Sequence, residues 1–222
     1  MTDQVFTIIR ASILKGEMPA GYRLRIRDLA EQVGTSVMPV REAIRRLEEA
    51  GLAERVPHKG AVVKALSLTD LVHVYDVRRL LEVEAARLGA ERIQPTDIER
   101  MQEQYDLMMS AVEDEQAVAI LDYDEAFLAT LYQASGNPVL VKAIQTLWER
   151  CRSYKIVGAR ATLQANDRTP LWGFQARLLE AARNKDPEDA ARVNNESLLN
   201  ATARIRDELA AESARGDAAA AP

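Results

Sequence analysis

The apolar residues of the first fifty positions recur with the period of an α-helix. This pattern predicts helices over residues 3–15, Ile26–Val33 and Val37–Ala50, each followed by a glycine that suits a helix end. Thr35 and Ser36 lie directly before the third helix and can cap its N-terminus. The sequence therefore predicts two short helices joined by a tight turn, with one further helix before them.

A hairpin is expected directly after these helices. Two short apolar-rich runs, Ala53–Val56 and Ala61–Lys64, flank the segment Pro57-His58-Lys59-Gly60, whose proline and glycine favour a turn. Helix, turn, helix and hairpin in this order are the layout of a winged helix-turn-helix. In such a unit the N-terminal turn of the second helix enters the major groove of DNA. There its backbone N–H groups, hydroxyls and arginines meet phosphates and base edges.

A second interpretation of the same residues involves no ligand. The helix predicted over 37–50 carries Arg41, Arg45 and Arg46 outside its apolar stripe. Arg45 and Arg46 lie near Glu42, Glu48 and Glu49. Arginine and glutamate at this spacing pair on helix surfaces. The arginines could therefore belong to a solvated amphipathic hairpin rather than to a DNA-binding surface.

Residues from Ser67 onward are predicted to be almost wholly helical. The run from Ser67 to Asp70 resembles a capping box, and Pro138 and Pro187 suit the first positions of helices. The predicted helices cover 68–92, 95–113, 117–134, 138–161, 168–183 and 187–212. We expect a predominantly all-α fold class, with a small two-stranded wing and an antiparallel bundle of about six helices.

The same layout predicts the domain boundaries. We expect a winged helix-turn-helix domain over 1–66, an all-helical domain over 67–212, and a disordered tail over 213–222, where the run SARGDAAAAP follows the last helix. In the first helix of the bundle the residues expected to point inward are Leu71, Val74, Val77, Leu81, Ala85 and Leu88.

The charge is distributed unevenly between the two predicted domains. The net charge of the chain is −5, which taken alone argues against a nucleic-acid partner. Residues 1–66 hold 11 Lys and Arg against 8 Asp and Glu, a net charge of +3, whereas residues 67–222 have a net charge of −8. A mildly basic module fused to an acidic one fits a DNA-binding domain joined to a domain with another task.

Composition excludes several other classes of protein. The 222 residues are 47% hydrophobic and 28% charged, no apolar run is long enough to span a membrane, and MTDQVF lacks the arrangement of a secretion signal. The single cysteine, Cys151, suits a reducing cytoplasm and is interpreted as a small buried hydrophobe; Trp148 and Trp172 are likewise interpreted as core residues. There is no Ser/His/Asp set, Cys/His pair or phosphate loop, so we do not expect an enzyme.

From Leu24 to Val63 the chain resembles the N-terminal domain of GntR-type bacterial transcription regulators. The resemblance lies in the run DLAEQVGTSVMPVREAIRRLEEAGL and in HKGAVV of the hairpin. It implies that operator DNA is contacted by residues at the family's motif positions, which here are Arg27, Thr35, Ser36, Arg41, Arg45, Lys59 and Gly60. Val37 and Met38 stand where the family often has a polar or basic residue.

The second half resembles the FadR-type C-terminal domain of the same family, in VRRLLEVEAARLGA, in ASGNP and in LLEAARNKDPEDAAR. The resemblance implies a homodimer whose all-helical bundle holds a small effector, commonly an organic acid. Many members also hold a metal through one aspartate and three histidines. The aspartate corresponds to Asp124, but the three histidine positions are Leu128, Gln175 and Ser197. The chain has only His58 and His73, so we expect no bound metal.

An anionic effector then needs other partners. The candidate effector-binding residues are Arg78, Asp124, Leu128, Arg152, Tyr154, Gln175 and Ser197, with Asn194 as a further hydrogen-bonding group. An arginine fork matches a carboxylate. Two alternatives stay open: Arg78 can form a structural bridge with Glu82 four residues on, and Gln175 can be a surface residue.

The sequence therefore favours a dimeric transcription regulator that binds a pseudo-palindromic operator and responds to a small carboxylate effector. The main alternative is a ligand-independent DNA-binding regulator, in which side chains such as Leu128 fill the effector pocket.

Overall fold

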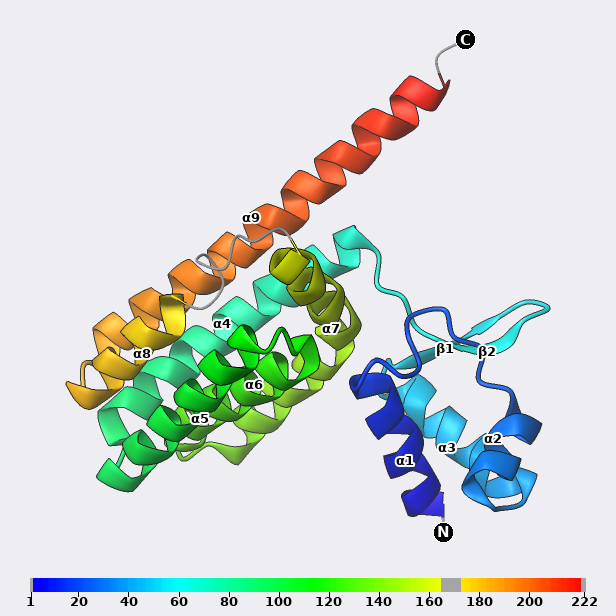
Figure 1. Ribbon diagram of the computed structural model, residues 1–222, viewed down its shortest axis with the longest axis horizontal. Helices are drawn as coiled ribbons and strands as arrows, with labels where there is room; N and C mark the ends of the chain where they lie inside the picture. Colours follow the sequence, from blue (N-terminus) through cyan, green and yellow to red (C-terminus); the bar gives the residue numbers. More distant parts are fainter. Residues whose placement is uncertain (1, 165–172, 221–222) are drawn as a thin grey trace. The chain divides into compact units, whose positions relative to one another are not determined.

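The computed structural model describes residues 2–164 and 173–220, with side chains up to residue 211 (Figure 1). Its contacts divide the chain into two compact units. The first consists of Met1–Leu66 together with Trp148–Val157, and the second of Ser67–Leu147 and Gly158–Pro222. The first unit thus contains, besides the predicted N-terminal domain, ten residues from the middle of a later helix.

The first unit has the predicted order of elements. It contains the helices α1 (Thr2–Leu14), α2 (Ile26–Val33) and α3 (Val37–Glu49), and the antiparallel strands β1 (Ala53–Val56) and β2 (Gly60–Val63). Gly34 ends α2 in the left-handed conformation, with φ of 70°, which a glycine adopts without steric strain. The bounds of α2 and β1 match the predicted ones, and the ends of α1, α3 and β2 differ from them by at most one residue.

The core of this unit forms where α1 lies across α3. Val5, Ile9 and Ile13 of α1 are spaced by four residues and point to one side, and all three are at most 2% exposed. Leu47 of α3 and Leu24 before α2 belong to the same apolar cluster. The helix ahead of the helix-turn-helix is therefore part of the DNA-binding fold and not an appendage to it.

One feature of the wing was not predicted. Arg23 forms an antiparallel bridge with Val62, and the backbone N–H of Leu24 donates to the carbonyl oxygen of Ala61 at 2.9 Å. The segment before α2 therefore pairs with β2 as a short third extended piece. This pairing joins the wing to the start of α2, because the paired residues Arg23 and Leu24 lie just before the helix in the sequence.

The second unit is built from six helices in the described residues: α4 (Leu68–Arg92), α5 (Pro95–Glu113), α6 (Ala117–Gln133), the ends of α7 (Pro138–Gln164), α8 (Gly173–Arg183) and α9 (Pro187–Ala220). The antiparallel pair α4 and α9 lie side by side, as do α5 and α6 (Figure 1). Ser67 caps α4 by accepting a hydrogen bond from the Asp70 amide at 3.0 Å, as its sequence predicts.

The inward face of α4 differs from the prediction. Val77 is 45% exposed, whereas Arg78 and Glu82 are 4% and 1% exposed and lie within the bundle. The inward stripe follows positions 71, 74, 75, 78, 82, 85, 86 and 89, which includes the two charged residues. The prediction of an inward Val77 was wrong. It rested on the spacing of apolar residues, and the buried positions here are occupied by the charged pair Arg78 and Glu82.

The end of the chain also differs from the prediction. The last helix, α9, runs to Ala220, whereas we predicted a helix end near residue 212 and a disordered tail over 213–222. The tail is rich in alanine, the residue with the highest intrinsic helix propensity, and this continues the helix past Gly216.

Residues 168–172 of the predicted eighth helix, which include Trp172, lie outside the described residues. No helix in the described ranges is long and apolar enough to cross a membrane.

Candidate nucleic-acid interface and buried polar centre

The two sides of α3 have different chemistry. Its inner side consists of Val40, Ala43, Ile44 and Leu47, which are at most 3% exposed. Its outer side presents Val37, Met38, Arg41 and Arg45, which are all exposed and share one face because they are three or four residues apart. The helix is therefore anchored by one side and offers the other to a partner.

The N-terminal turn of α3 suits an anion. Ser36 is its N-cap in an extended conformation, with φ of −77° and ψ of 167°, and its side chain makes no capping hydrogen bond. The first turn of α3 contains no acidic residue. Free amide N–H groups, an exposed hydroxyl and the positive end of the helix dipole together favour a phosphate group at this place.

Arg41 and Arg45 differ in how far their charges are compensated. Arg45 donates from Nε to Glu42 Oε2 at 3.1 Å and also pairs with Glu49. The hydrogen bond from Arg45 holds the pKa of the Glu42 carboxyl below its usual value. Arg41 is exposed and has no ion pair among the described residues. Of the two arginines, Arg41 has the cation that no described side chain compensates.

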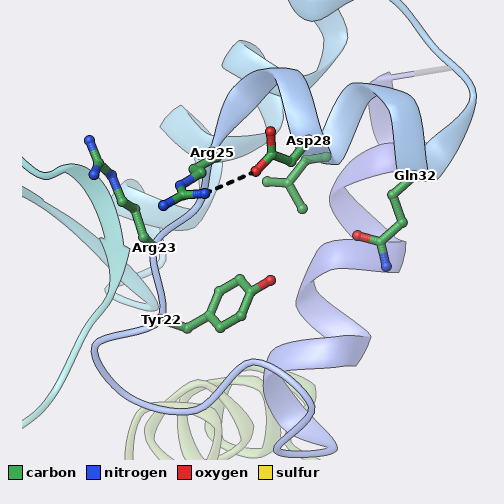
Figure 2. A pocket seen from close by; sticks show the side chains of 6 residues that line it. Tyr22, Arg23, Arg25, Asp28 and Gln32 are labelled. Carbon is green, nitrogen blue, oxygen red and sulfur yellow. Dashed lines mark ion pairs between the residues drawn. The ribbon is translucent and has the colours of Figure 1, made fainter.

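Around the start of α2 lies a hollow of about 250 Å³, lined by Tyr22, Arg23, Arg25, Asp28, Leu29 and Gln32 (Figure 2). Arg25 Nη1 stands 3.6 Å from Asp28 Oδ2 across it. Arg23 and Arg25 were not among the predicted DNA-binding residues, although Arg23-Leu24-Arg25-Ile26-Arg27 alternates cations with inward apolar residues. Arg27 itself is exposed in the first turn of α2 and has no ion pair in the described part of the chain.

The wing tip is a tight turn. The amide of Lys59 donates to the carbonyl oxygen of Val56 at 3.1 Å, and His58 has a positive φ of 63°. Proline at the second and a left-handed residue at the third position are the pattern of a type II turn. Gly60 follows with φ of 78°, and Lys59 projects into solvent without an ion pair among the described residues. The tip thus offers the Lys59 cation, which no described side chain compensates, beside the backbone of Gly60.

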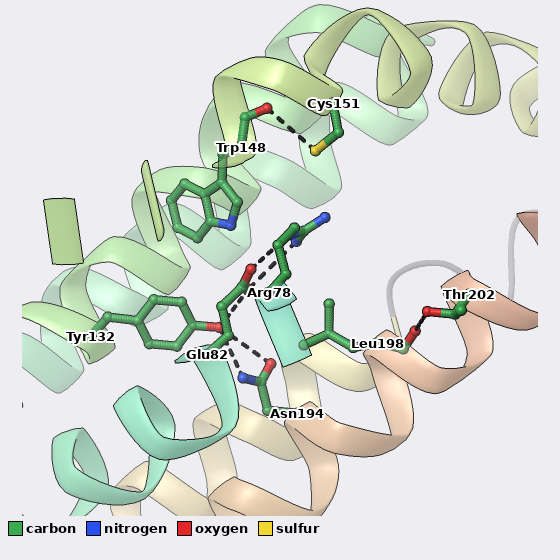
Figure 3. A network of polar contacts seen from close by, with 8 residues as sticks. All are labelled: Arg78, Glu82, Tyr132, Trp148, Cys151, Asn194, Leu198 and Thr202. Carbon is green, nitrogen blue, oxygen red and sulfur yellow. Dashed lines mark hydrogen bonds and ion pairs between the residues drawn. The ribbon is translucent and has the colours of Figure 1, made fainter. Parts of the chain in front are cut away.

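A buried polar network occupies the centre of the bundle (Figure 3). Arg78 Nε donates to Glu82 Oε1 at 2.6 Å, which confirms the alternative that Arg78 forms a structural bridge. The Tyr132 hydroxyl donates to Glu82 Oε2 at 3.1 Å and accepts from Asn194 Nδ2 at 3.0 Å. Burial and the Glu82 carboxylate raise the pKa of Tyr132 well above its usual value, so its hydroxyl stays protonated and remains a donor.

A second buried pair joins α6 to α8. Gln175 Nε2 donates to Asp124 Oδ1 at 2.7 Å, and the two residues are 8% and 7% exposed. The alternative that Gln175 is a surface residue was therefore wrong. Because Gln175 gives its N–H₂ group to the carboxylate, its Oε1 atom faces elsewhere, and this atom is buried without a hydrogen-bond partner.

These residues do not fit the three-histidine metal site that the family resemblance implies. Leu128 is 8% exposed and has no ligand atom, and Gln175 already uses its amide group to hold Asp124. His58 lies on the wing and His73 is exposed on α4. No group of three His, Cys, Asp or Glu side chains with metal-binding proximity occurs in the described residues.

The remaining candidates for the effector site fall in different places. Arg152 and Tyr154 belong to the part of α7 that clusters with the first unit, where Arg152 Nε donates to the carbonyl oxygen of Leu14 at 3.0 Å. Ser197 is half-buried on α9, less than one turn from Asn194. Trp148 and Cys151, interpreted as core residues, are 4% and 0% exposed.

A winged helix-turn-helix with an exposed arginine face on its second helix, followed by an all-helical unit, defines a class of DNA-binding regulators. Comparison with known protein families identifies the particular family of regulators. Residues 1–63 match the family "Bacterial regulatory proteins, gntR family", and residues 73–200 match the FCD domain. The chain belongs to the GntR family and carries an FCD domain. It is a DNA-binding transcription regulator and not an enzyme.

Relatives and solved structures agree with this assignment. The HTH-type transcriptional regulator McbR of Escherichia coli (strain K12) is 30% identical over 150 residues, which are 68% of this chain and 68% of that one. A probable D-xylose utilization operon transcriptional repressor of Paenarthrobacter nicotinovorans is 31% identical over 147 residues, 66% of this chain and 65% of that one. The structure of E. coli McbR/YncC has a TM-score of 0.79 at 26% identity, covering 94% of this chain and 98% of that chain.

A putative GntR regulator from Rhodococcus sp. RHA1 shares the fold with the same TM-score of 0.79, at 23% identity and covering 93% of this chain and 97% of that one. The names of these relatives describe transcription regulators, and the name of one describes a repressor of a D-xylose utilization operon. The two solved structures share the fold with this chain over more than nine-tenths of its length.

Proposed function

We propose that this regulator acts in the cytoplasm as a homodimer on a short pseudo-palindromic operator, and that a small effector in the helical unit changes its affinity for DNA. The two-fold symmetry of a dimer presents two α3 helices to two half-sites, which is why the operator is expected to be palindromic. Arg41, Arg27 and Lys59 support the DNA side of the proposal, because they are exposed cations without ion pairs among the described residues.

The observation that carries the effector side is the buried Oε1 atom of Gln175. A buried acceptor without a partner costs about 1–3 kcal/mol, which a bound donor recovers. Asp124 beside it is a second acceptor. An effector at this place therefore needs a hydroxyl or amino group to donate. We combine this requirement with the organic acid that the family resemblance implies and propose a small hydroxy or amino acid.

Matched pairs of acids test this proposal. Thermal denaturation of the full chain is measured with lactate against propionate and with malate against succinate, which differ only in a hydroxyl group. We expect the hydroxy acid of a pair to raise the melting temperature, because a ligand of the native state stabilises it by mass action. The same acid should change operator affinity by about 5- to 150-fold in a fluorescence anisotropy titration.

The variant Gln175→Leu removes the acceptor and should abolish the stabilisation by the hydroxy acid. Gln133→Leu is the matched control, because Gln133 is an exposed residue on α6. If Gln175→Leu responds to the acid as the unmodified chain does, the assignment of the site is wrong. Light scattering during size-exclusion chromatography tests the dimer; a monomeric mass at micromolar concentration would contradict it.

A ligand-independent regulator is the second candidate, and specific contacts favour it. Leu128 is buried, Arg78 is paired with Glu82, and Asp124 accepts a hydrogen bond from Gln175, so the Arg78 and Asp124 side chains already have partners within the protein. In that case no acid, with or without a hydroxyl group, changes the melting temperature or the operator affinity. DNA binding itself would be unaffected by this outcome.

A further inference from the structure

Two large apolar side chains lie exposed at the start of α3. Val37 is 39% and Met38 is 67% exposed, although the next residues along the inner side of the helix, Val40 and Ala43, are completely buried. Leaving an apolar side chain in water forgoes the free energy that burial provides. Two neighbouring residues of this kind, at the end of the helix that approaches DNA, indicate that a partner covers them in the bound state.

The surroundings of these side chains indicate what the partner offers. Val37 precedes Arg41 by four residues and Met38 precedes it by three, so all three occupy one face of α3. Arg41 has no ion pair among the described residues, and the first turn of α3 has no acidic residue. A surface that combines an available cation, free amide N–H groups and two apolar side chains fits a negatively charged partner with apolar groups beside its charges.

We infer that Val37 and Met38 read the 5-methyl groups of thymines in the operator half-site. The inference rests on DNA binding through α3. In the major groove the thymine methyl is the one apolar group on the base edges, and aliphatic side chains recognise it by contact. Neither valine nor methionine can form the hydrogen bonds that identify guanine, adenine or cytosine. Their contribution to specificity is therefore the choice of thymine over cytosine, which lacks the methyl group.

The two side chains have complementary properties for this task. Val37 is β-branched and has one strongly preferred rotamer in a helix, so it presents a fixed methyl surface. Met38 has an unbranched, flexible thioether chain that adapts to the contour of a groove. Arg41, one turn further along, is placed to bind a guanine or a phosphate next to the thymines. We therefore expect thymines to lie adjacent to the position read by Arg41.

Replacement of thymine by uracil tests the inference, because it removes the methyl group and leaves all hydrogen-bonding groups in place. Bound sequences are first selected from a random DNA library with the full chain, and each thymine of the half-site is then replaced by deoxyuridine. At the thymines read by α3, affinity should fall about fourfold for each methyl group, which is the value of burying one such group. Deoxyuridine in the flanking DNA serves as the control and should have no effect.

Side-chain variants identify the residues that make the contact. Met38→Ala and Val37→Ala should bind the thymine operator more weakly, and each should lose the difference between thymine and uracil at one position. Arg41→Ala should bind more weakly but keep that difference. Ile8→Ala is the matched control, since Ile8 is a 42% exposed apolar residue on α1. Unchanged circular dichroism shows that these exposed substitutions leave the fold intact.

The outcomes separate this inference from the DNA-binding function itself. If the selection yields a specific sequence but every uracil substitution leaves affinity within 1.5-fold, the inference is wrong while DNA binding stands. The inference is also wrong if the variants at Val37 and Met38 retain the full preference for thymine. If no sequence is selected at all, specific DNA binding by the chain fails, and the inference fails with it.

Discussion

Gly89 of α4 lies directly against the backbone of Leu131 in α6. A Cβ atom at Gly89 would stand 2.1 Å from the Leu131 carbonyl oxygen, far inside contact distance, so only glycine permits this approach of the two helices. We predict that Gly89→Ala destabilises the bundle by about 1–3 kcal/mol or more, because the helices must separate. The measurement is urea denaturation followed by circular dichroism.

Gly158 of α7 offers the matched control. It lies within a helix, and a Cβ atom there would meet nothing within 4 Å. Gly158→Ala should therefore stabilise the chain by about 0.5–1 kcal/mol, through the higher helix propensity of alanine. Equal effects of the two substitutions would show that helix propensity, and not the contact with Leu131, determines the result at Gly89.

The buried pair Arg78 and Glu82 leads to a second prediction. Arg78→Met leaves the Glu82 carboxylate buried without its counter-charge and should cost about 3–5 kcal/mol of unfolding free energy. The double variant with Glu82→Leu removes both charges and should recover most of this loss. Equilibrium denaturation of the three proteins measures both values. A double variant as unstable as Arg78→Met would show that the network contributes more than mutual neutralisation.

The unequal pairing of two arginines on α3 predicts unequal effects on DNA binding. Arg41→Ala should lower operator affinity by about 1–3 kcal/mol, because its cation is available to a base or a phosphate. Arg45→Ala should have a smaller effect, since Glu42 and Glu49 already compensate its charge. Fluorescence anisotropy at one fixed salt concentration is the measurement. Unchanged affinity of Arg41→Ala would remove that residue from the DNA-binding surface.

Metal content provides a further prediction. We expect the purified chain to contain no stoichiometric Zn, Ni or Mn, because Leu128 supplies no ligand atom and the amide N–H₂ group of Gln175 is bound to Asp124. Inductively coupled plasma mass spectrometry after dialysis is the measurement. Metal retained at one equivalent per chain would mean that other side chains have replaced the missing histidines.

Much of the local structure could be predicted from the sequence, because periodicity and capping are local properties. The bounds of α2 were predicted to the residue, and the starts of α4, α5 and α7 followed from Ser67, Pro95 and Pro138. The outer face of α3 was likewise evident from the spacing of its arginines. The assignment of all seven residues to DNA contacts stays a prediction: Arg27, Thr35, Ser36, Arg41, Arg45, Lys59 and Gly60.

Contacts between elements could not be predicted in the same way. A single sequence does not show that Arg23 pairs with β2 beyond the wing. It offered the bridge between Arg78 and Glu82 as one alternative, but it did not show that these residues displace Val77 from the inner face of α4. Gly89 is one glycine in a helical run, and only the position of α6 shows why it has no side chain there.

By itself the sequence determined the class of fold, the division into a basic and an acidic half, and the exposed arginine side of α3. These depend on hydrophobic spacing, on end caps and on charge along the chain. Tertiary structure alone decided which charged side chains form ion pairs within the protein and which stay available to a partner. The distinction depends on distances between side chains far apart in sequence, such as Gln175 and Asp124, and on burial, which makes the unpartnered Gln175 Oε1 costly.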